Sequence, residues 1–193
     1  FFSTHTPPSA ILSGLVGSEM CIRDRLTIEQ TKQSFKNLIV TIVGDIAHSR
    51  VARSTAHGLS IMGVKELRFV SPQEFAPQKN ITPGAKHYTD LHKGLEDADV
   101  VMALRIQHER INDTSNMNLE EYIQNYRLTE KNMNIAAPDA IVMHPGPMNR
   151  DIEIESSLAD SKQSVILRQV ANGVAVRMSL LSELAKNYGT DNE

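Results

Sequence analysis

Two arginines stand at the start of a predicted helix in the segment 42–54, IVGDIAHSRVARS. The apolar start of the segment predicts the end of a buried strand, and Ser49 is the expected N-cap, which places Arg50 and Arg53 in the first helical turn. A helix N-terminus carries about half a positive charge, so acidic residues are the favourable choice there. Free backbone N–H groups, the helix dipole and a guanidinium would together attract a carboxylate or a phosphate. Solvated or ion-paired arginines are the alternative, and this segment alone does not decide between them.

Two further polar clusters follow predicted strands. Arg105 and Gln107 begin the segment 105–110, RIQHER, and residues 144–147, HPGP, follow the last predicted strand. Ligands of open parallel sheets bind beyond the carboxyl ends of the strands, so the clusters are expected to share one crevice. Arg50 and Arg105 could then hold the two carboxylates of one small ligand by bidentate pairing.

The HPGP segment predicts a turn that offers carbonyl acceptors. Pro145 and Pro147 have no N–H, and Gly146 permits close approach of a ligand to the backbone. Such a turn suits a ligand –NH2 group better than a phosphate. His144 is expected to be a packed histidine at the strand end, and Asp45 a brace of its loop.

The elements that position these clusters alternate regularly between short apolar runs and helical patterns. This alternation predicts a doubly wound α/β fold with a mainly parallel sheet of about five strands and a long C-terminal helix. The expected strands are 37–43, 66–70, 87–88, 99–104 and 140–143, and the expected helices are 51–62, 90–98, 119–128 and 164–187, with one further helical turn in 129–136. The polar segment 105–120 is expected to be a functional loop because it is too long for an ordinary connection.

Composition limits the class of protein. The chain has 193 residues and a formal net charge of −3, so a polybasic nucleic-acid surface is not expected. No apolar run has the length needed to span a bilayer, so no membrane partner is expected. Cys21 is the only cysteine, and the seven histidines form no zinc-binding pattern, so neither a disulfide nor a metal site is predicted. These features predict a cytoplasmic protein without metal.

Residues 1–25 differ from the rest of the chain. They show poor periodicity and no charged region of a signal peptide, and the piece 18–25, SEMCIRDR, resembles translated sequencing-adapter readthrough. We therefore expect residues 1–25 to be a non-native or disordered leader and residues 26–193 to be one domain with its C-terminal helix.

Four motifs in this order, GDIAHSRVARS, ALRIQHER, MHPGPMNRDIEI and QVANGVAVRM, resemble the aspartate-binding half of aspartate carbamoyltransferase catalytic chains. That family transfers a carbamoyl group from carbamoyl phosphate to the amine of L-aspartate, in pyrimidine biosynthesis, without a cofactor. The resemblance implies that Arg50 and Arg105 bind the aspartate carboxylates and that Gln107 orients aspartate. It also implies that the backbone carbonyls of Gly146 and Pro147 face the amine of carbamoyl phosphate.

The resemblance begins near Leu26, and the motifs of the family's carbamoyl-phosphate domain do not occur in the chain. We therefore expect no complete catalytic set here and no turnover by this chain alone, although full-length family chains are expected to be homotrimers. The last helix would pack on the absent domain, so its apolar stripe should be partly uncovered. The stripe consists of Ile166, Val170, Val174, Met178, Leu181 and Ala185.

Three other functions are alternatives. An ornithine carbamoyltransferase shares the fold, but ornithine has one carboxylate and the pair Arg50 and Arg105 favours two. A non-catalytic dicarboxylate-binding module of the same fold stays open. A nucleotide-binding Rossmann domain is disfavoured because no G-x-G-x-x-G follows the first strand.

Overall fold

The computed structural model describes residues 18–77, 82–106 and 118–189. Five strands form one sheet in the order β3-β2-β1-β4-β5, and every neighbouring pair is parallel. The strands are β1 (Ile39–Val43), β2 (Glu66–Val70), β3 (Lys86–Tyr88), β4 (Val100–Ala103) and β5 (Ile141–Met143). The predicted doubly wound α/β fold is confirmed.

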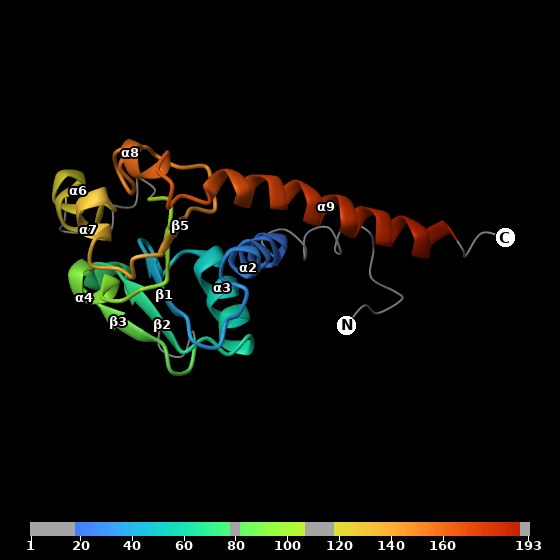
Figure 1. Ribbon diagram of the computed structural model, residues 1–193, viewed down its shortest axis with the longest axis horizontal. Coiled ribbons are helices and arrows are strands. Elements are labelled where there is room, and N and C mark those ends of the chain that lie inside the picture. Colours follow the sequence, from blue (N-terminus) through green and yellow to red (C-terminus); the bar gives the residue numbers. More distant parts are fainter. Residues whose placement is uncertain (1–17, 78–81, 107–117, 190–193) are drawn as a thin grey trace.

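Helices cover both faces of the sheet (Figure 1). Helices α2 and α3 contribute to the apolar core on one face, and α4, α6, α7 and α8 contribute to the core on the other. The helices are α2 (Ser18–Lys32), α3 (Arg50–Ile61), α4 (Leu91–Leu95), α6 (Leu119–Tyr126), α7 (Glu130–Met133), α8 (Ser156–Ala159) and α9 (Ile166–Gly189), with a 3-10 turn η1 (Gln73–Phe75).

Strand β1 shows why the sheet is covered on two sides. All its residues are buried, with Val40 and Ile42 in one apolar core and Ile39 and Val43 in the other. Successive side chains of a strand point to opposite faces, so a continuous apolar run needs a layer of helices on each face.

Helix α3 carries the end signals that the sequence predicts. The Ser49 hydroxyl accepts a hydrogen bond from the Ala52 N–H at 3.0 Å, and Gly63 follows the helix with φ +74°. An L residue adopts this φ only with strain, so glycine suits the position after the helix. The first turn contains no acidic residue.

Helix α2 was not predicted. Part of its buried surface is polar, because Asp24 and Thr27 lie against α9 and accept hydrogen bonds from Gln169 Nε2 at 2.7 Å and Asn172 Nδ2 at 2.8 Å. An apolar stripe is the signal by which a helix is recognised in a sequence, and polar packing weakens it. Residues 18–25, which we expected to belong to the leader, form the first half of this helix, and their foreign origin stays a prediction.

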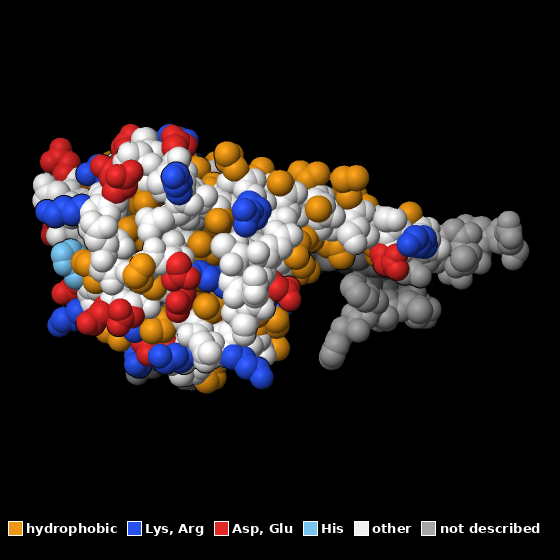
Figure 2. Space-filling view, in the orientation of Figure 1, with side chains coloured by type: hydrophobic (Ala, Val, Ile, Leu, Met, Phe, Trp, Pro, Cys, Tyr) orange, Lys and Arg blue, Asp and Glu red, His pale blue; other side chains and the backbone are white. Residues whose placement is uncertain are grey.

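Helix α9 extends well beyond the rest of the molecule (Figure 1). Four residues of the predicted apolar stripe are more than half exposed: Val170, Val174, Met178 and Leu181. Apolar side chains gather along this helix in the space-filling view (Figure 2). Ile166, by contrast, is buried against the body. The expectation of a partly uncovered stripe is confirmed.

Within the part of the chain that the structure describes, none of the helices is long and apolar enough to cross a bilayer.

The chain covers the outer edge of β5 with the segment that leads into α9. Val142 N–H donates to the Gln163 carbonyl at 2.8 Å, and its carbonyl accepts from the Val165 N–H at 3.0 Å. The edge strand β5 therefore has hydrogen-bond partners on both sides.

Candidate functional site

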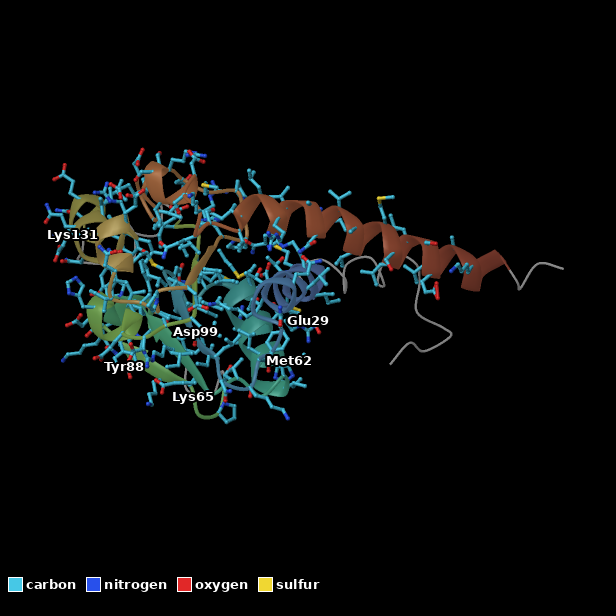
Figure 3. All side chains as sticks on the ribbon, viewed as in Figure 1. Glu29, Met62, Lys65, Tyr88, Asp99 and Lys131 are labelled. Carbon is cyan, nitrogen blue, oxygen red and sulfur yellow. The ribbon has the colours of Figure 1, made fainter. Side chains whose placement is uncertain are left out.

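The three segments predicted to bind a ligand leave the sheet at the same edge. Strand β4 lies between β1 and β5, and all three run parallel, so their carboxyl ends are neighbours. Lys65 and Asp99, which directly precede β2 and β4, mark the opposite edge and are labelled in Figure 3. The sheet topology thus places the starts of the three segments at one edge of the sheet.

The loop after β1 is held by a buried carboxylate. Asp45 is 4% exposed, and its Oδ1 accepts hydrogen bonds from the His48 backbone N–H at 3.1 Å and lies 2.9 Å from His48 Nδ1. The His48 ring meets the Phe75 ring edge-on at a centroid distance of 6.3 Å, and the Ala47 N–H donates to the Phe75 carbonyl. Asp45 is therefore a brace of this loop, as expected.

Arg50 is the first residue of α3 and lies exposed beside this braced loop. Arg53, one turn further along, is also exposed. Neither guanidinium makes a hydrogen bond or an ion pair with another residue in the described ranges. The structure therefore leaves the positive charge of Arg50 available at the carboxyl edge of the sheet.

Arg105 follows β4 in a strictly alternating segment. Leu104 and Ile106 are 2% and 1% exposed, whereas Arg105 between them is exposed. Leu104 N–H donates to the Val43 carbonyl at 2.8 Å, which continues the β1–β4 ladder and fixes the direction of the segment. Gln107, the other predicted ligand residue here, and the rest of the predicted functional loop from 107 to 117 lie outside the described residues.

The turn after β5 is built on buried polar side chains. His144 is 1% exposed, and its Nε2 lies 3.1 Å from Oε1 of Glu153, which is 2% exposed. The same carboxylate oxygen accepts the Asn149 N–H at 2.6 Å, and Asn149 Nδ2 donates to the Ile106 carbonyl at 3.1 Å. This chain of contacts ties the turn to the segment that carries Arg105.

The backbone of the turn is unusual at Gly146 and Pro147. Gly146 has φ +74°, and the Gly146–Pro147 peptide bond is cis. A Cβ added at Gly146 would meet no atom within 4 Å apart from its chain neighbours, so there is open space on that side of the residue. Pro147 is exposed, so the turn reaches the surface.

The sequence predicts His144 to be a packed strand-end residue, but it does not predict the roles of Glu153 and Asn149. Glu153 lies between two isoleucines in the segment 151–154. An acidic residue in such a pattern is expected to be exposed at the surface of an edge segment. Its contact with the buried His144 ring is a tertiary contact, which the residues next to Glu153 along the chain do not indicate.

A fully buried tyrosine lies beneath the site. Burial raises the pKa of the Tyr122 hydroxyl well above its ordinary value, and the carboxylates of Glu153 and Asp45 raise it further. Tyr122 therefore remains protonated at neutral pH, which suits a hydrogen-bond donor and excludes the role of a general base. The Tyr122 ring stacks on Tyr126 at a centroid distance of 5.3 Å.

Taken together, this edge offers two exposed cations and a turn rich in carbonyl acceptors. In the described ranges, no group of three or more His, Cys, Asp and Glu residues is placed to hold a metal ion. The arrangement fits an anionic small molecule that also carries an N–H donor.

Residues 36–184 match the family model described as "Aspartate/ornithine carbamoyltransferase, Asp/Orn binding domain". The chain belongs to this family. A protein of Ruthia magnifica subsp. Calyptogena magnifica, the aspartate carbamoyltransferase catalytic subunit, is 48% identical over 163 residues. The alignment covers 83% of this chain and 50% of that relative, so the chain spans about half the relative's length.

Solved structures share the fold at lower sequence identity. Ornithine carbamoyltransferase from Pyrococcus furiosus superposes with a TM-score of 0.75 at 21% identity, covering 86% of this chain and 55% of that one. Aspartate transcarbamoylase from Trypanosoma cruzi, in complex with carbamoyl phosphate, gives 0.72 at 20% identity, covering 85% and 54%.

Proposed function

We propose that this chain is the L-aspartate-binding half of an aspartate carbamoyltransferase catalytic chain. The observation that carries the proposal is the meeting of three ligand-binding segments at one edge of the sheet, with two exposed arginines and a carbonyl-rich turn. The aspartate branch of the family is favoured over the ornithine branch by the 48% identity to an aspartate carbamoyltransferase catalytic subunit. Two arginines also match the two carboxylates of aspartate better than the single carboxylate of ornithine.

The proposed roles follow from position and charge. Arg50 and Arg105 bind the two carboxylates of aspartate, and Gln107 orients the bound amino acid. The carbonyls of Gly146 and Pro147 accept hydrogen bonds from the –NH2 of carbamoyl phosphate. Trypanosoma cruzi aspartate transcarbamoylase has been solved with carbamoyl phosphate and aspartate bound together, which supports a site with these two ligands.

The reaction would proceed by attack of the neutral aspartate amine on the carbamoyl carbon. A new C–N bond forms in a tetrahedral intermediate, the C–O bond to phosphate breaks, and the proton lost by the amine is taken up by the leaving phosphate. This half of the site contributes mainly by holding the amine in position and by removing the freedom of the two reactants. The complete enzyme is proposed to be a cytoplasmic homotrimer that needs a carbamoyl-phosphate domain, so this chain alone should give no N-carbamoyl-L-aspartate.

Ligand titration of the 193-residue chain, followed by NMR at low salt, tests the proposal. Succinate should bind weakly and saturably, and Arg50→Ala or Arg105→Ala should each weaken it about tenfold or more, because each removes a charged hydrogen-bond donor worth roughly 1.5–3 kcal/mol. Arg53→Ala is the matched control, since Arg53 is an exposed arginine of the same helix. Equal losses in all three variants, or tighter binding of L-ornithine than of L-aspartate, would contradict the proposal.

A further inference from the structure

Every backbone N–H group of residues 144–147 donates a hydrogen bond within the protein. His144 N–H donates to Oε1 of Gln169 at 3.0 Å, and Gly146 N–H donates to Nδ1 of His144 at 2.9 Å. Pro145 and Pro147 have no N–H. Among the described residues, the carbonyls of Gly146 and Pro147 have no hydrogen-bond partner.

The contact with Gly146 fixes the protonation of the His144 ring. A nitrogen that accepts a backbone N–H carries no proton, so Nδ1 is unprotonated and the ring proton resides on Nε2. This proton points to Glu153 Oε1 at 3.1 Å. The ring is thus held from both sides in one tautomer, in the way that a second group commonly orients a functional imidazole.

The consequence lies in the hydrogen-bonding character of the turn. Without an acceptor at Nδ1, the Gly146 N–H would be the one backbone donor of residues 144–147 that could bind a ligand. A site with one N–H donor and two free carbonyls could bind an oxyanion as well as an amide. With Nδ1 as its partner, this N–H is withdrawn, and the turn offers acceptors alone. Buried or bound oxyanions that face carbonyl oxygens are disfavoured, whereas –NH2 groups are favoured.

We infer that His144 is a positioning and specificity-determining residue, which makes the turn selective for N–H donors by occupying the Gly146 N–H, and that Glu153 holds His144 in the required tautomer. This inference rests on the proposed function, because it assigns the turn the amide of the carbamoyl group and denies it the phosphate. It concerns side chains behind the turn rather than the carbonyls that meet the ligand.

Two substitutions separate the proposed role from a packing role. His144→Asn places an amide oxygen near the position of Nδ1, so the acceptor for Gly146 N–H is kept and the contact with Glu153 is lost. His144→Gln reaches the position of Nε2, so the contact with Glu153 is kept and the acceptor is lost. Gln is the closer match to His in size, so a mere packing role would favour the Gln variant.

The readout is the ratio of two affinities measured by NMR titration of the full 193-residue chain. N-carbamoyl-L-aspartate carries both carboxylates and the carbamoyl –NH2, whereas succinate carries the carboxylates alone. We expect the wild-type chain to prefer N-carbamoyl-L-aspartate, the Asn variant to keep this preference within about threefold, and the Gln variant to lose about tenfold, the cost of roughly one hydrogen bond. An equal preference in both variants, or a larger loss in the Asn variant, would overturn the inference.

A second measurement does not depend on ligand binding or on the variants folding. Two-dimensional 15N spectra of the wild-type chain report which ring nitrogen of His144 is protonated, and we expect an unprotonated Nδ1 and a slowly exchanging Gly146 amide. A protonated Nδ1 would overturn the inference even if the proposed function holds. A chain that binds neither ligand would contradict the proposed function, and the 15N result would still decide the inference.

Discussion

The turn after β5 and the arginine-bearing ends of β1 and β4 share one edge of the sheet but differ in how their polar groups are satisfied. In the turn, the buried side chains of His144, Glu153 and Gln169 take up the backbone donors. Arg50 and Arg105 are exposed and make no hydrogen bond or ion pair within the described residues. One part of the site is fixed by the fold, and the other keeps its charge for a partner.

This difference separates the energetic roles of the two regions. Polar groups that are buried and bonded contribute to stability, because the loss of one partner leaves another group unsatisfied. Exposed charges without partners contribute little to stability and remain free to bind an anion. Substitutions of the buried side chains behind the turn should therefore lower stability as well as change binding, whereas substitutions of the arginines should affect binding alone.

The largest expected effect is that of Glu153→Ala. This change removes the acceptor of both His144 Nε2–H and the Asn149 N–H, so we expect the free energy of unfolding to fall by about 3 kcal/mol. Urea denaturation at pH 7 measures the difference.

Glu153→Gln is the matched variant for this test. Glu153 Oε2 is buried and has no hydrogen-bond partner within the described ranges, so replacing it by –NH2 while keeping the oxygen at Oε1 should cost only about 1 kcal/mol. Glu96→Ala, at an exposed site, should change the free energy of unfolding by less than about 0.5 kcal/mol. A loss in Glu153→Ala as small as that of Glu96→Ala would show that the turn is not braced as described.

An intermediate effect on stability is expected for the ion pair of Arg68 with Glu66. Unlike Arg50 and Arg105, Arg68 has hydrogen-bond partners in the described residues. Its Nε donates to Glu66 Oε1 at 2.6 Å, and Nη1 donates to the carbonyls of Gly94 and Glu96. The hydrogen bond from Arg68 lowers the pKa of the Glu66 carboxyl in the folded state. The ionised carboxylate therefore contributes to stability above the unfolded pKa, and this contribution is lost as the pH falls through the folded pKa.

We therefore expect Glu66→Gln to lower the free energy of unfolding at pH 7 by at most about 1 kcal/mol. The difference from the wild-type chain should begin to shrink as the pH falls below the ordinary glutamate pKa of about 4.3, and it should vanish only below the lower pKa of the folded state, where the carboxyl is protonated in both states. Urea denaturation at pH 7, 5 and 3 checks this, and a difference that grows toward low pH would have the wrong sign.

The smallest effect on stability is expected for Arg105→Ala. Because Arg105 is exposed and has no partner in the described part of the chain, its removal should change the free energy of unfolding by less than about 0.5 kcal/mol. The same urea experiment measures it, with Arg68→Ala as the paired arginine for comparison. A loss as large as that of Arg68→Ala would mean that Arg105 is a structural residue.

The positions of the strands and of the exposed arginines could be predicted from the sequence because their signals are local. Continuous apolar runs mark β1 and β4, and Ser49 with Gly63 marks the ends of α3. Arg105 was predicted to be exposed because it comes shortly after the end of a buried apolar run. In each case, the residue type and its neighbours along the chain determine the environment.

The bracing of the turn could not be predicted, because its partners are far apart in the sequence. Gln169 of α9 accepts the His144 N–H across 25 residues of sequence, and Glu153 contacts the His144 ring across nine. Helix α2 was missed for a related reason, since Asp24 is bonded by Gln169 and contributes no apolar pattern. Long-range polar contacts leave no periodic trace in a sequence.

The segment that leads into α9 also affects how separate molecules meet. An uncovered strand at the end of a sheet can recruit a strand from another molecule and so begin aggregation. The bonds of Val142 to Gln163 and Val165 occupy that position on β5, and β3 at the other end is only three residues long. Backbone pairing between copies is therefore hindered at both edge strands of the sheet, β5 and β3. Any self-association of this chain should proceed through side-chain contacts.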